Sequence, residues 1–252
     1  MLFDSIVYGP IHSRRLGVSL GVNLMPTTAK LCTFDCVYCE CGWNQPILHP
    51  TLPTRDEVRE ALRTQLSAHQ SQLDVITFSG NGEPTLHPDF LGIIEDTCAL
   101  RDEYCPKAKV SVLSNSTQLG RKDVVEALRL CDNRILKLDS AIDTTMRLVD
   151  KPVNAQLTVG QVVEWLSAFD GDFTLQTCFL RGVYEGQVID NTTDEELQAW
   201  YDIVDTLRPK QVMIYVIDRE TPLKTLEKIP ADKMEEIAAP LRKKGIDIVV
   251  SV

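Results

Sequence analysis

The sequence lacks the features that would carry a chain into or across a membrane. Its first ten residues, MLFDSIVYGP, include an acid and lack the basic stretch and apolar run of a secretory signal peptide. No apolar run approaches the ~20 residues that a bilayer-spanning helix needs. We therefore expect a cytoplasmic protein without membrane contacts, in a compartment where disulfides are rare and clustered cysteines usually do chemistry.

Positive charge is also scarce. The 252 residues include 26 Lys and Arg against 36 Asp and Glu, a net charge of −10, and the basic feature that remains is the pair Arg14-Arg15. Because phosphate contacts supply most of a protein's affinity for nucleic acids, this balance disfavours a polyanionic partner. Low-complexity segments, flexible linkers and close internal repeats are absent as well, so the length indicates one domain over residues 1–252.

Cysteine, in contrast, is concentrated in one place. Four of the eight cysteines fall within residues 32–41, CTFDCVYCEC, and the first three have the spacing Cys32-x3-Cys36-x2-Cys39. Thiolates this close together are usually ligands of a metal ion or of an iron–sulfur cluster. If three of them hold a four-iron cluster, one iron remains available to another ligand. Cys41, two residues further on, is either a fourth ligand, a redox-active thiol or a spectator.

The other four cysteines are scattered, and no CxxC pair in the C-terminal half indicates a second cluster. We expect each of them to be a small buried side chain in a helix or strand. They are Cys98, Cys105, Cys131 and Cys178.

Strand-like and helix-like segments alternate along the chain. After an irregular lead-in over residues 1–17, short apolar runs at 18–24, 75–79, 110–114, 134–139, 173–179, 211–217 and 246–252 predict strands. Helical spacing or capping signals mark residues 54–70, 90–103, 122–131, 159–169, 194–207 and 232–244. This order predicts right-handed βαβ units and a parallel sheet. With fewer than eight units, we expect an α/β fold of the partial TIM-barrel type, with its core in residues 18–217 and a final helix and strand in 218–252.

Polar residues recur where the predicted strands end, which is where parallel α/β folds place their chemistry. Each has a plainer explanation, since GNGEP at 80–84 is also a strong turn sequence and Lys137 with Asp139 is also a plausible ion pair. The recurrence at successive strand ends nevertheless favours one shared site. The residues are Gly80, Asn81, Gly82, Glu83, Ser114, Asn115, Lys137, Asp139, Ser140, Gln176, Arg181 and the segment 215–219.

Two of these motifs resemble a known family. Cys32-x3-Cys36-x-Tyr38-Cys39 is similar to the signature of the radical S-adenosylmethionine (SAM) superfamily, and GNGEP resembles its SAM-binding motif. The segments GPIHSRRLGVSLGVNLMP, SGNGEPTLHP and VMIYVIDR are similar to compact members often labelled wyosine-synthase-like, after a tRNA-modifying relative.

The resemblance implies a partial (β/α)6 barrel with a [4Fe–4S] cluster on Cys32, Cys36 and Cys39, whose fourth iron is chelated by SAM. It further implies that SAM contacts come from strand-end residues and from the cysteine loop. Residues 80–83 would face the methionyl amino group, and Tyr38 would lie against the adenine. The ribose or the carboxylate would be contacted by Asn115 or by the group of Lys137, Asp139 and Ser140. The edge of the adenine would be contacted by the backbone of Val216 and Ile217. Ser114, Gln176 and Arg181 would complete the cofactor site.

The implied reaction is reductive cleavage of SAM to methionine and a 5′-deoxyadenosyl radical, which abstracts hydrogen from a substrate. An external one-electron reductant of the flavodoxin or ferredoxin type would supply the electron. A small metabolite or nucleoside suits a compact acidic protein best, while a tRNA base, peptide or protein substrate remains an alternative. An iron–sulfur electron carrier with Cys41 as fourth ligand and a four-cysteine zinc site are further readings, but neither explains the polar strand ends.

Overall fold

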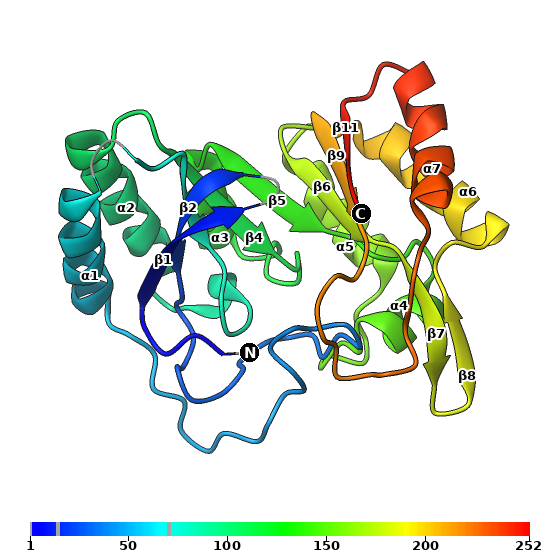
Figure 1. Cartoon of the computed structure of the whole chain (residues 1–252), viewed down its shortest axis with the longest axis horizontal. Coiled ribbons are helices and arrows are strands. Elements are labelled where there is room, and N and C mark those ends of the chain that lie inside the picture. Colours follow the sequence, from blue (N-terminus) through cyan, green and yellow to red (C-terminus); the bar gives the residue numbers. More distant parts are fainter. Residues whose placement is uncertain (1, 14–15, 70–71) are drawn as a thin grey trace. The chain divides into compact units, whose positions relative to one another are not determined.

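The computed structural model describes residues 2–13, 16–69 and 72–252 (Figure 1). The basic pair Arg14-Arg15 lies outside these residues. Backbone packing divides the chain into two compact units. The first comprises Met1–Cys32 and Asn44–Ile135, and the second comprises Thr33–Trp43 and Leu136–Val252. The expectation of a single domain remains a prediction.

The strands of the first unit are β1 (Val7–Ser13), β2 (Gly17–Val22), β3 (Val75–Phe78) and β4 (Lys109–Ser114). β2, β3 and β4 pair in parallel, with Ser19 opposite Val75 and Val75 opposite Lys109. The expectation of an irregular lead-in was wrong, because β1 pairs antiparallel with β2. The register of β1 shifts between Tyr8 and Ile11, so a bulge accommodates the Gly-Pro pair in this edge strand. The strand was missed in the sequence because Gly-Pro is typical of a turn.

The helices of the first unit are α1 (Arg55–Ala68), α2 (Phe90–Tyr104) and α3 (Lys122–Leu130), with a 3-10 turn, η1, at Pro84–Leu86. The predicted capping box is confirmed: the Thr54 side chain accepts from the Glu57 backbone, and the Glu57 carboxylate accepts from the Thr54 backbone. In Figure 1, α1 and α2 lie side by side. Arg55 joins them by donating two hydrogen bonds of 2.7 Å to Asp96.

The second unit has a parallel sheet of β6 (Thr174–Cys178), β9 (Gln211–Tyr215) and β11 (Ile248–Ser251), in that order. β5 (Asn133–Lys137) runs across the point in the chain where the two units are divided. The helices α5 (Val159–Ser167), α6 (Asp194–Leu207) and α7 (Ala231–Lys243) confirm the predicted alternation. α6 begins where the side chain of Thr193 accepts from the Glu196 backbone, and α7 ends just before Gly245, which has a φ of +76°.

Sequence periodicity did not predict two features of the second unit. One is the short helix α4 (Asp143–Val149). The other is a small antiparallel sheet with the order β10 (Glu227–Lys228), β7 (Leu180–Tyr184) and β8 (Gln187–Asp190). β7 and β8 form the yellow hairpin of Figure 1, and its two-residue turn, Glu185-Gly186, has positive φ at both positions.

Three of the scattered cysteines, Cys105, Cys131 and Cys178, are buried as predicted, whereas Cys98 is half-buried. Burial raises the pKa of all four thiols, which makes them poor nucleophiles. Among the residues that the structure describes, no helix is both long enough and apolar enough to cross a bilayer.

Candidate active site

In the first unit, the GNGEP loop after β3 is joined to the residue that precedes Cys32. The backbone N–H of Leu31 donates to the carbonyl of Asn81 at 2.9 Å, and the N–H of Glu83 donates to the carbonyl of Leu31 at 3.1 Å. Gly82 lies between these bonds with a φ of +146°, and a Cβ at this position would lie 1.8 Å from the Leu31 oxygen. Only glycine fits such a close approach, so this motif glycine has a steric role in placing the start of the cysteine loop.

The Asn81 side chain is fully buried and is committed to the protein scaffold. Its Nδ2 donates to the carbonyls of Phe3 at 2.7 Å and Pro26 at 2.9 Å, and its Oδ1 accepts from the Phe3 backbone at 2.8 Å. Asn23, at the end of β2, accepts from the Asn81 backbone at 3.0 Å. Asn23 was not among the predicted site residues, although an asparagine at the end of an apolar strand indicates a candidate position.

Glu83 connects the end of β3 to the end of β4. Its buried carboxylate accepts from the Asn115 backbone at 2.7 Å, the Ser114 hydroxyl at 2.9 Å and the Thr85 backbone at 3.1 Å. Burial raises the pKa of Glu83, although these hydrogen bonds act in the opposite direction. The donors around this carboxylate come from the protein itself, so the geometry gives Glu83 and Ser114 a positioning role.

Asn115 reaches the first cysteine of the motif. Its Nδ2 lies 3.4 Å from Cys32 Sγ, while its Oδ1 accepts from the backbone and the hydroxyl of Thr117 at 3.1 and 2.8 Å. The Cys32 carbonyl accepts from Asn44 Nδ2 at 3.3 Å. In the first unit, a half-buried cysteine sulfur thus accepts a hydrogen bond from an amide that is itself held in place.

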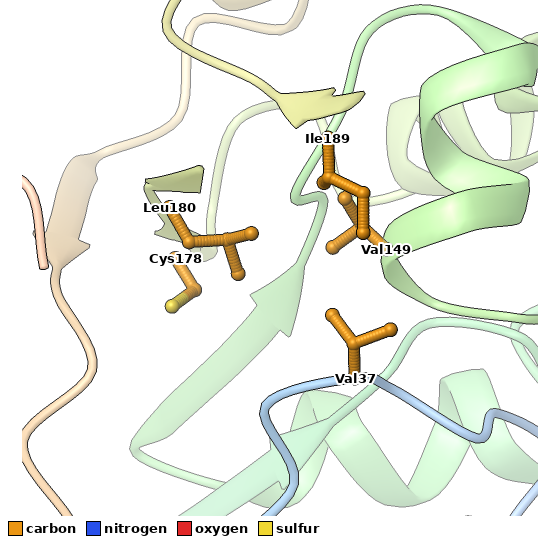
Figure 2. Packing of buried hydrophobic residues seen from close by; sticks show 5 residues of the cluster. All are labelled: Val37, Val149, Cys178, Leu180 and Ile189. Atoms are coloured by element: carbon orange, nitrogen blue, oxygen red, sulfur yellow. The ribbon is translucent and has the colours of Figure 1, made fainter. Parts of the chain in front are cut away.

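In the second unit, the middle of the cysteine loop is anchored by Val37. Its backbone N–H donates to the carbonyl of Val149 at 2.9 Å, and its side chain is fully buried. Figure 2 shows Val37 directed toward Val149 in the cluster that also contains Cys178, Leu180 and Ile189. Cys36 and Tyr38 flank Val37, so this apolar contact restricts the positions of both.

Next to this anchor lies a buried ionic network around Lys137. Its Nζ lies 2.7 Å from Asp150 Oδ1, 3.2 Å from Asp139 Oδ2 and 3.0 Å from Cys36 Sγ. Burial acts to lower the pKa of Lys137, but Asp139, Asp150 and Cys36 together raise it well above its ordinary value. Lys137 is therefore an ammonium ion whose neighbours are two carboxyl groups and a cysteine ligand candidate.

Asp150, the C-cap residue of α4, was not predicted. Burial raises its pKa, and Lys137 acts in the opposite direction. The sequence signal for this residue was weak, because Asp150-Lys151-Pro152 reads as an ordinary turn.

Tyr38 and Asp139 are in direct contact, which no local sequence pattern predicts. The Tyr38 hydroxyl donates to Asp139 Oδ2, and Asp139 Oδ1 accepts from the Cys178 backbone at 2.9 Å. Burial and the charge of Asp139 raise the pKa of Tyr38 well above its ordinary value, so the phenol remains a proton donor. Lys137 Nζ lies 5.0 Å from the centre of the Tyr38 ring.

The remaining predicted residues of the second unit have varied surroundings. Ser140 donates to the buried carboxylate of Glu196 at 2.9 Å. Arg181 is exposed on β7 and pairs with Glu227 at 2.7 Å, so it does not join the network around Lys137. Gln176 on β6 is buried, and its Nε2 has no hydrogen-bond partner among the described residues.

The other predicted positions lie on the segment after β9 and in the cysteine loop. The backbone of Val216 donates to the Ser251 carbonyl at 3.2 Å, and Ile217 follows it half-buried. Cys39 donates its backbone N–H to the Cys36 carbonyl at 3.1 Å. Cys41 is half-buried.

The donor chemistry of the motif fits an iron–sulfur cluster. Two of its sulfurs, those of Cys32 and Cys36, accept hydrogen bonds from nitrogen donors, as cluster-ligating thiolates do. Cys32 belongs to the first unit, while Cys36 and Cys39 belong to the second. Among the described residues, no three His, Cys, Asp or Glu side chains are gathered as metal ligands, so the ligand set is inferred from spacing and donor chemistry.

Sequence comparison places these motifs in a family. The radical SAM superfamily pattern matches residues 27–189, which include the cysteine loop, GNGEP and Lys137. A protein of Synechocystis described as a UPF0026 protein is 30% identical over 224 residues, which is 86% of this chain and 77% of that protein. A Brachyspira hyodysenteriae protein described as GTPase Obg is 28% identical over 235 residues, 91% of this chain. The chain spans only 32% of the length of that relative.

Solved structures share the fold. SuiB of Streptococcus suis bound to SAM has a TM-score of 0.65 at 13% identity, covering 89% of this chain and 48% of that one. TYW1 with a lysine–pyruvate adduct bound has a TM-score of 0.64 at 14% identity, covering 89% of this chain and 73% of that one. These likenesses show an α/β fold of the partial TIM-barrel type, as predicted. With the family pattern matching more than half of its length, this chain belongs to the radical SAM superfamily.

Proposed function

We propose that this enzyme cleaves SAM reductively at a [4Fe–4S] cluster held by Cys32, Cys36 and Cys39. The superfamily is one of enzymes whose cofactors are SAM and such a cluster. The observation that carries the assignment of ligands is the Cys-x3-Cys-x2-Cys spacing within the matched residues, together with nitrogen donors to the sulfurs of Cys32 and Cys36. Three protein ligands would leave one iron for SAM.

When bound, the cluster and SAM supply one electron and a 5′-deoxyadenosyl radical that abstracts hydrogen from a substrate. The protein's task is to hold these groups close together and to keep water away. Backbone atoms of Gly80 and Gly82 are proposed to face the amino group of SAM, and those of Val216 and Ile217 to contact the adenine. Asn81, Glu83 and Ser114 would support these backbone atoms without contacting SAM, because their side chains are hydrogen-bonded to the protein.

The electron would come from an external one-electron donor of the flavodoxin or ferredoxin type. For the substrate, we favour a small metabolite or a nucleoside. The net charge of −10 supports this choice, because a polyanion such as tRNA is repelled by an acidic surface. A tRNA base or a peptide is the alternative, and the structure of SuiB bound to its precursor peptide, which shares the fold, motivates the peptide.

The test is anaerobic reconstitution with iron and sulfide, followed by reduction in the presence of SAM. We expect close to four irons per chain, an EPR signal that changes when SAM is added, and formation of 5′-deoxyadenosine. Cys36→Ala should lose all three. A wild-type protein that holds zinc without iron, or a cluster whose EPR signal ignores SAM with no 5′-deoxyadenosine formed, would contradict the proposal.

A further inference from the structure

We infer that Lys137 is a positioning residue for the cluster, which donates a charged hydrogen bond to the sulfur of Cys36 and makes the cluster easier to reduce. This inference rests on the proposed function, since it assumes that Cys36 is a cluster ligand. It concerns a residue that contacts the ligand sulfur, whereas the family resemblance suggested a contact between Lys137 and SAM.

The geometry of the contact is that of a charged hydrogen bond. Lys137 Nζ lies 3.0 Å from Cys36 Sγ, and only 9% of the Lys137 residue is exposed to solvent. Such a bond is stronger in a buried setting than in water, because little solvent competes for either partner. The two residues are 101 positions apart in the chain, so the contact is a product of the tertiary fold.

Two carboxyl groups hold the ammonium in this position. Asp150 Oδ1 lies 2.7 Å and Asp139 Oδ2 lies 3.2 Å from Lys137 Nζ. Neither carboxyl side chain is more than 3% exposed. The three N–H bonds of the ammonium match three acceptors, the two carboxyl oxygens and the sulfur. This arrangement directs one N–H bond to Cys36 without requiring the lysine chain to reorganise when a cluster binds.

The cysteine loop is restrained on both sides of Val37 by the same strand end. Asp139, which contacts Lys137, also accepts from the hydroxyl of Tyr38. Cys36 and Tyr38 are therefore both attached to the end of β5 and the residues just after it, while Val37 between them is buried against Val149 (Figure 2). Because the backbone next to Cys36 is restrained, the Cys36 sulfur stays close to the ammonium group of Lys137.

The sulfur of Cys32 provides a contrast. Cys32 Sγ accepts from the neutral amide of Asn115 at 3.4 Å, a longer contact without charge. Cluster potentials depend in part on hydrogen bonds to the sulfurs, and the bond from Lys137 stabilises the more negative, reduced state. The charge of Lys137 is paired with Asp139 and with Asp150, whose Oδ1 also lies 3.5 Å from Cys36 Sγ, so the hydrogen bond carries the effect. Because the bond strengthens as the sulfur becomes more negative, its removal should change the reduction equilibrium by about tenfold.

The experiment compares reconstituted Lys137→Arg, Lys137→Gln and Lys137→Met with the wild type. Iron and sulfide content, circular dichroism and an EPR-monitored redox titration without SAM are measured for each. Arg retains the charge and the donors, Gln retains a donor alone, and Met retains neither. Lys210→Met is the matched control, since Lys210 is an exposed lysine of the same unit that pairs with Asp172 at 3.0 Å.

We expect Lys137→Met to be folded and about tenfold harder to reduce, a shift of ~59 mV toward negative potential for one electron. Lys137→Gln should be intermediate, and Lys137→Arg and Lys210→Met should be close to the wild type. If Lys137→Met is folded but fails to retain iron while Lys137→Arg retains it, the positioning role is also supported. A Lys137→Met cluster with wild-type iron content and potential would overturn the inference, as would equal losses in all three Lys137 variants.

Failure of the proposed function would be recognised separately. A wild-type protein that assembles no iron–sulfur cluster contradicts both the cluster proposal and the inference that depends on it. A wild-type cluster that responds to SAM, combined with a Lys137→Met cluster of unchanged potential, contradicts the inference alone.

Discussion

The carboxylate of Glu83 accepts the backbone N–H of Asn115 at 2.7 Å, across 32 positions of the chain. This bond joins the loop after β3 to the loop after β4, and Asn115 in turn donates to Cys32. The glutamate of the GNGEP motif therefore acts on the cysteine loop by two routes, through Asn115 and through the Leu31 carbonyl that accepts its backbone N–H. Disturbing Glu83 should affect the stability of the first unit.

We predict that Glu83→Gln lowers the free energy of unfolding by about 2–3 kcal/mol, because the amide turns a donor toward groups that already donate. Urea denaturation of the protein without cofactors measures this. Glu126→Gln, the same change at an exposed position of α3, should lie within about 0.5 kcal/mol of the wild type. Equal effects of the two substitutions would contradict a special role for Glu83.

Gly82 is predicted to be the least replaceable glycine of the motif. Gly82→Ala should destabilise the protein by at least ~3 kcal/mol, since its Cβ would overlap the Leu31 oxygen and its φ of +146° is unfavourable for alanine. The control is Gly160→Ala in α5, where the nearest atom would be 3.9 Å away and alanine should stabilise by about 0.5–1 kcal/mol. Thermal unfolding should therefore move in opposite directions for the two variants.

Gln176 should reveal a conflict between stability and ligand binding. Its buried Nε2 lacks a partner among the described residues, so Gln176→Met should stabilise the ligand-free protein by about 1–3 kcal/mol. If the amide donates to SAM, the same variant should show a smaller rise in Tm when SAM is added to the reconstituted protein. Gln187→Met, at an exposed position of β8, should change neither quantity. A destabilised Gln176→Met would argue that the amide already has a partner.

The ion pair between Arg55 and Asp96 should make stability depend on acid pH. The hydrogen bonds from Arg55 hold the pKa of Asp96 below its ordinary value near 3.8, although burial acts in the opposite direction. A carboxyl with a depressed pKa stabilises the fold above its unfolded-state pKa and loses this contribution as pH falls through the folded-state value. The stability difference between wild type and Asp96→Asn should therefore be constant from pH 7 to about 5 and shrink below 3.8.

Denaturation curves at each pH check this expectation. Asp56→Asn, at an exposed position in the first turn of α1, is the control, and its difference from the wild type should be smaller at pH 7. A difference for Asp96→Asn that persists unchanged at pH 3 would show that the charge of Asp96 does not contribute.

Local physics explains which elements could be predicted. Strands such as β3 are continuous apolar runs, and helices such as α1 have a capping motif and regularly spaced apolar residues. The alternation of strands and helices, and with it the parallel sheet, could therefore be predicted from short-range patterns. β1 was missed because Gly9-Pro10 reads as a turn, and its pairing depends on β2 and a bulge. α4 was missed because seven residues are too few for a periodic signal.

The cysteine spacing, the GNGEP motif and the βα order can all be read from short stretches of the chain, and they suffice to indicate the superfamily. Which polar groups meet, in contrast, depends on the folded chain. Local patterns do not predict that Lys137 contacts Cys36, that Tyr38 contacts Asp139, or that Glu83 contacts Asn115. Such partnerships join residues 32 to 101 positions apart, and they depend on which strand ends the fold brings together.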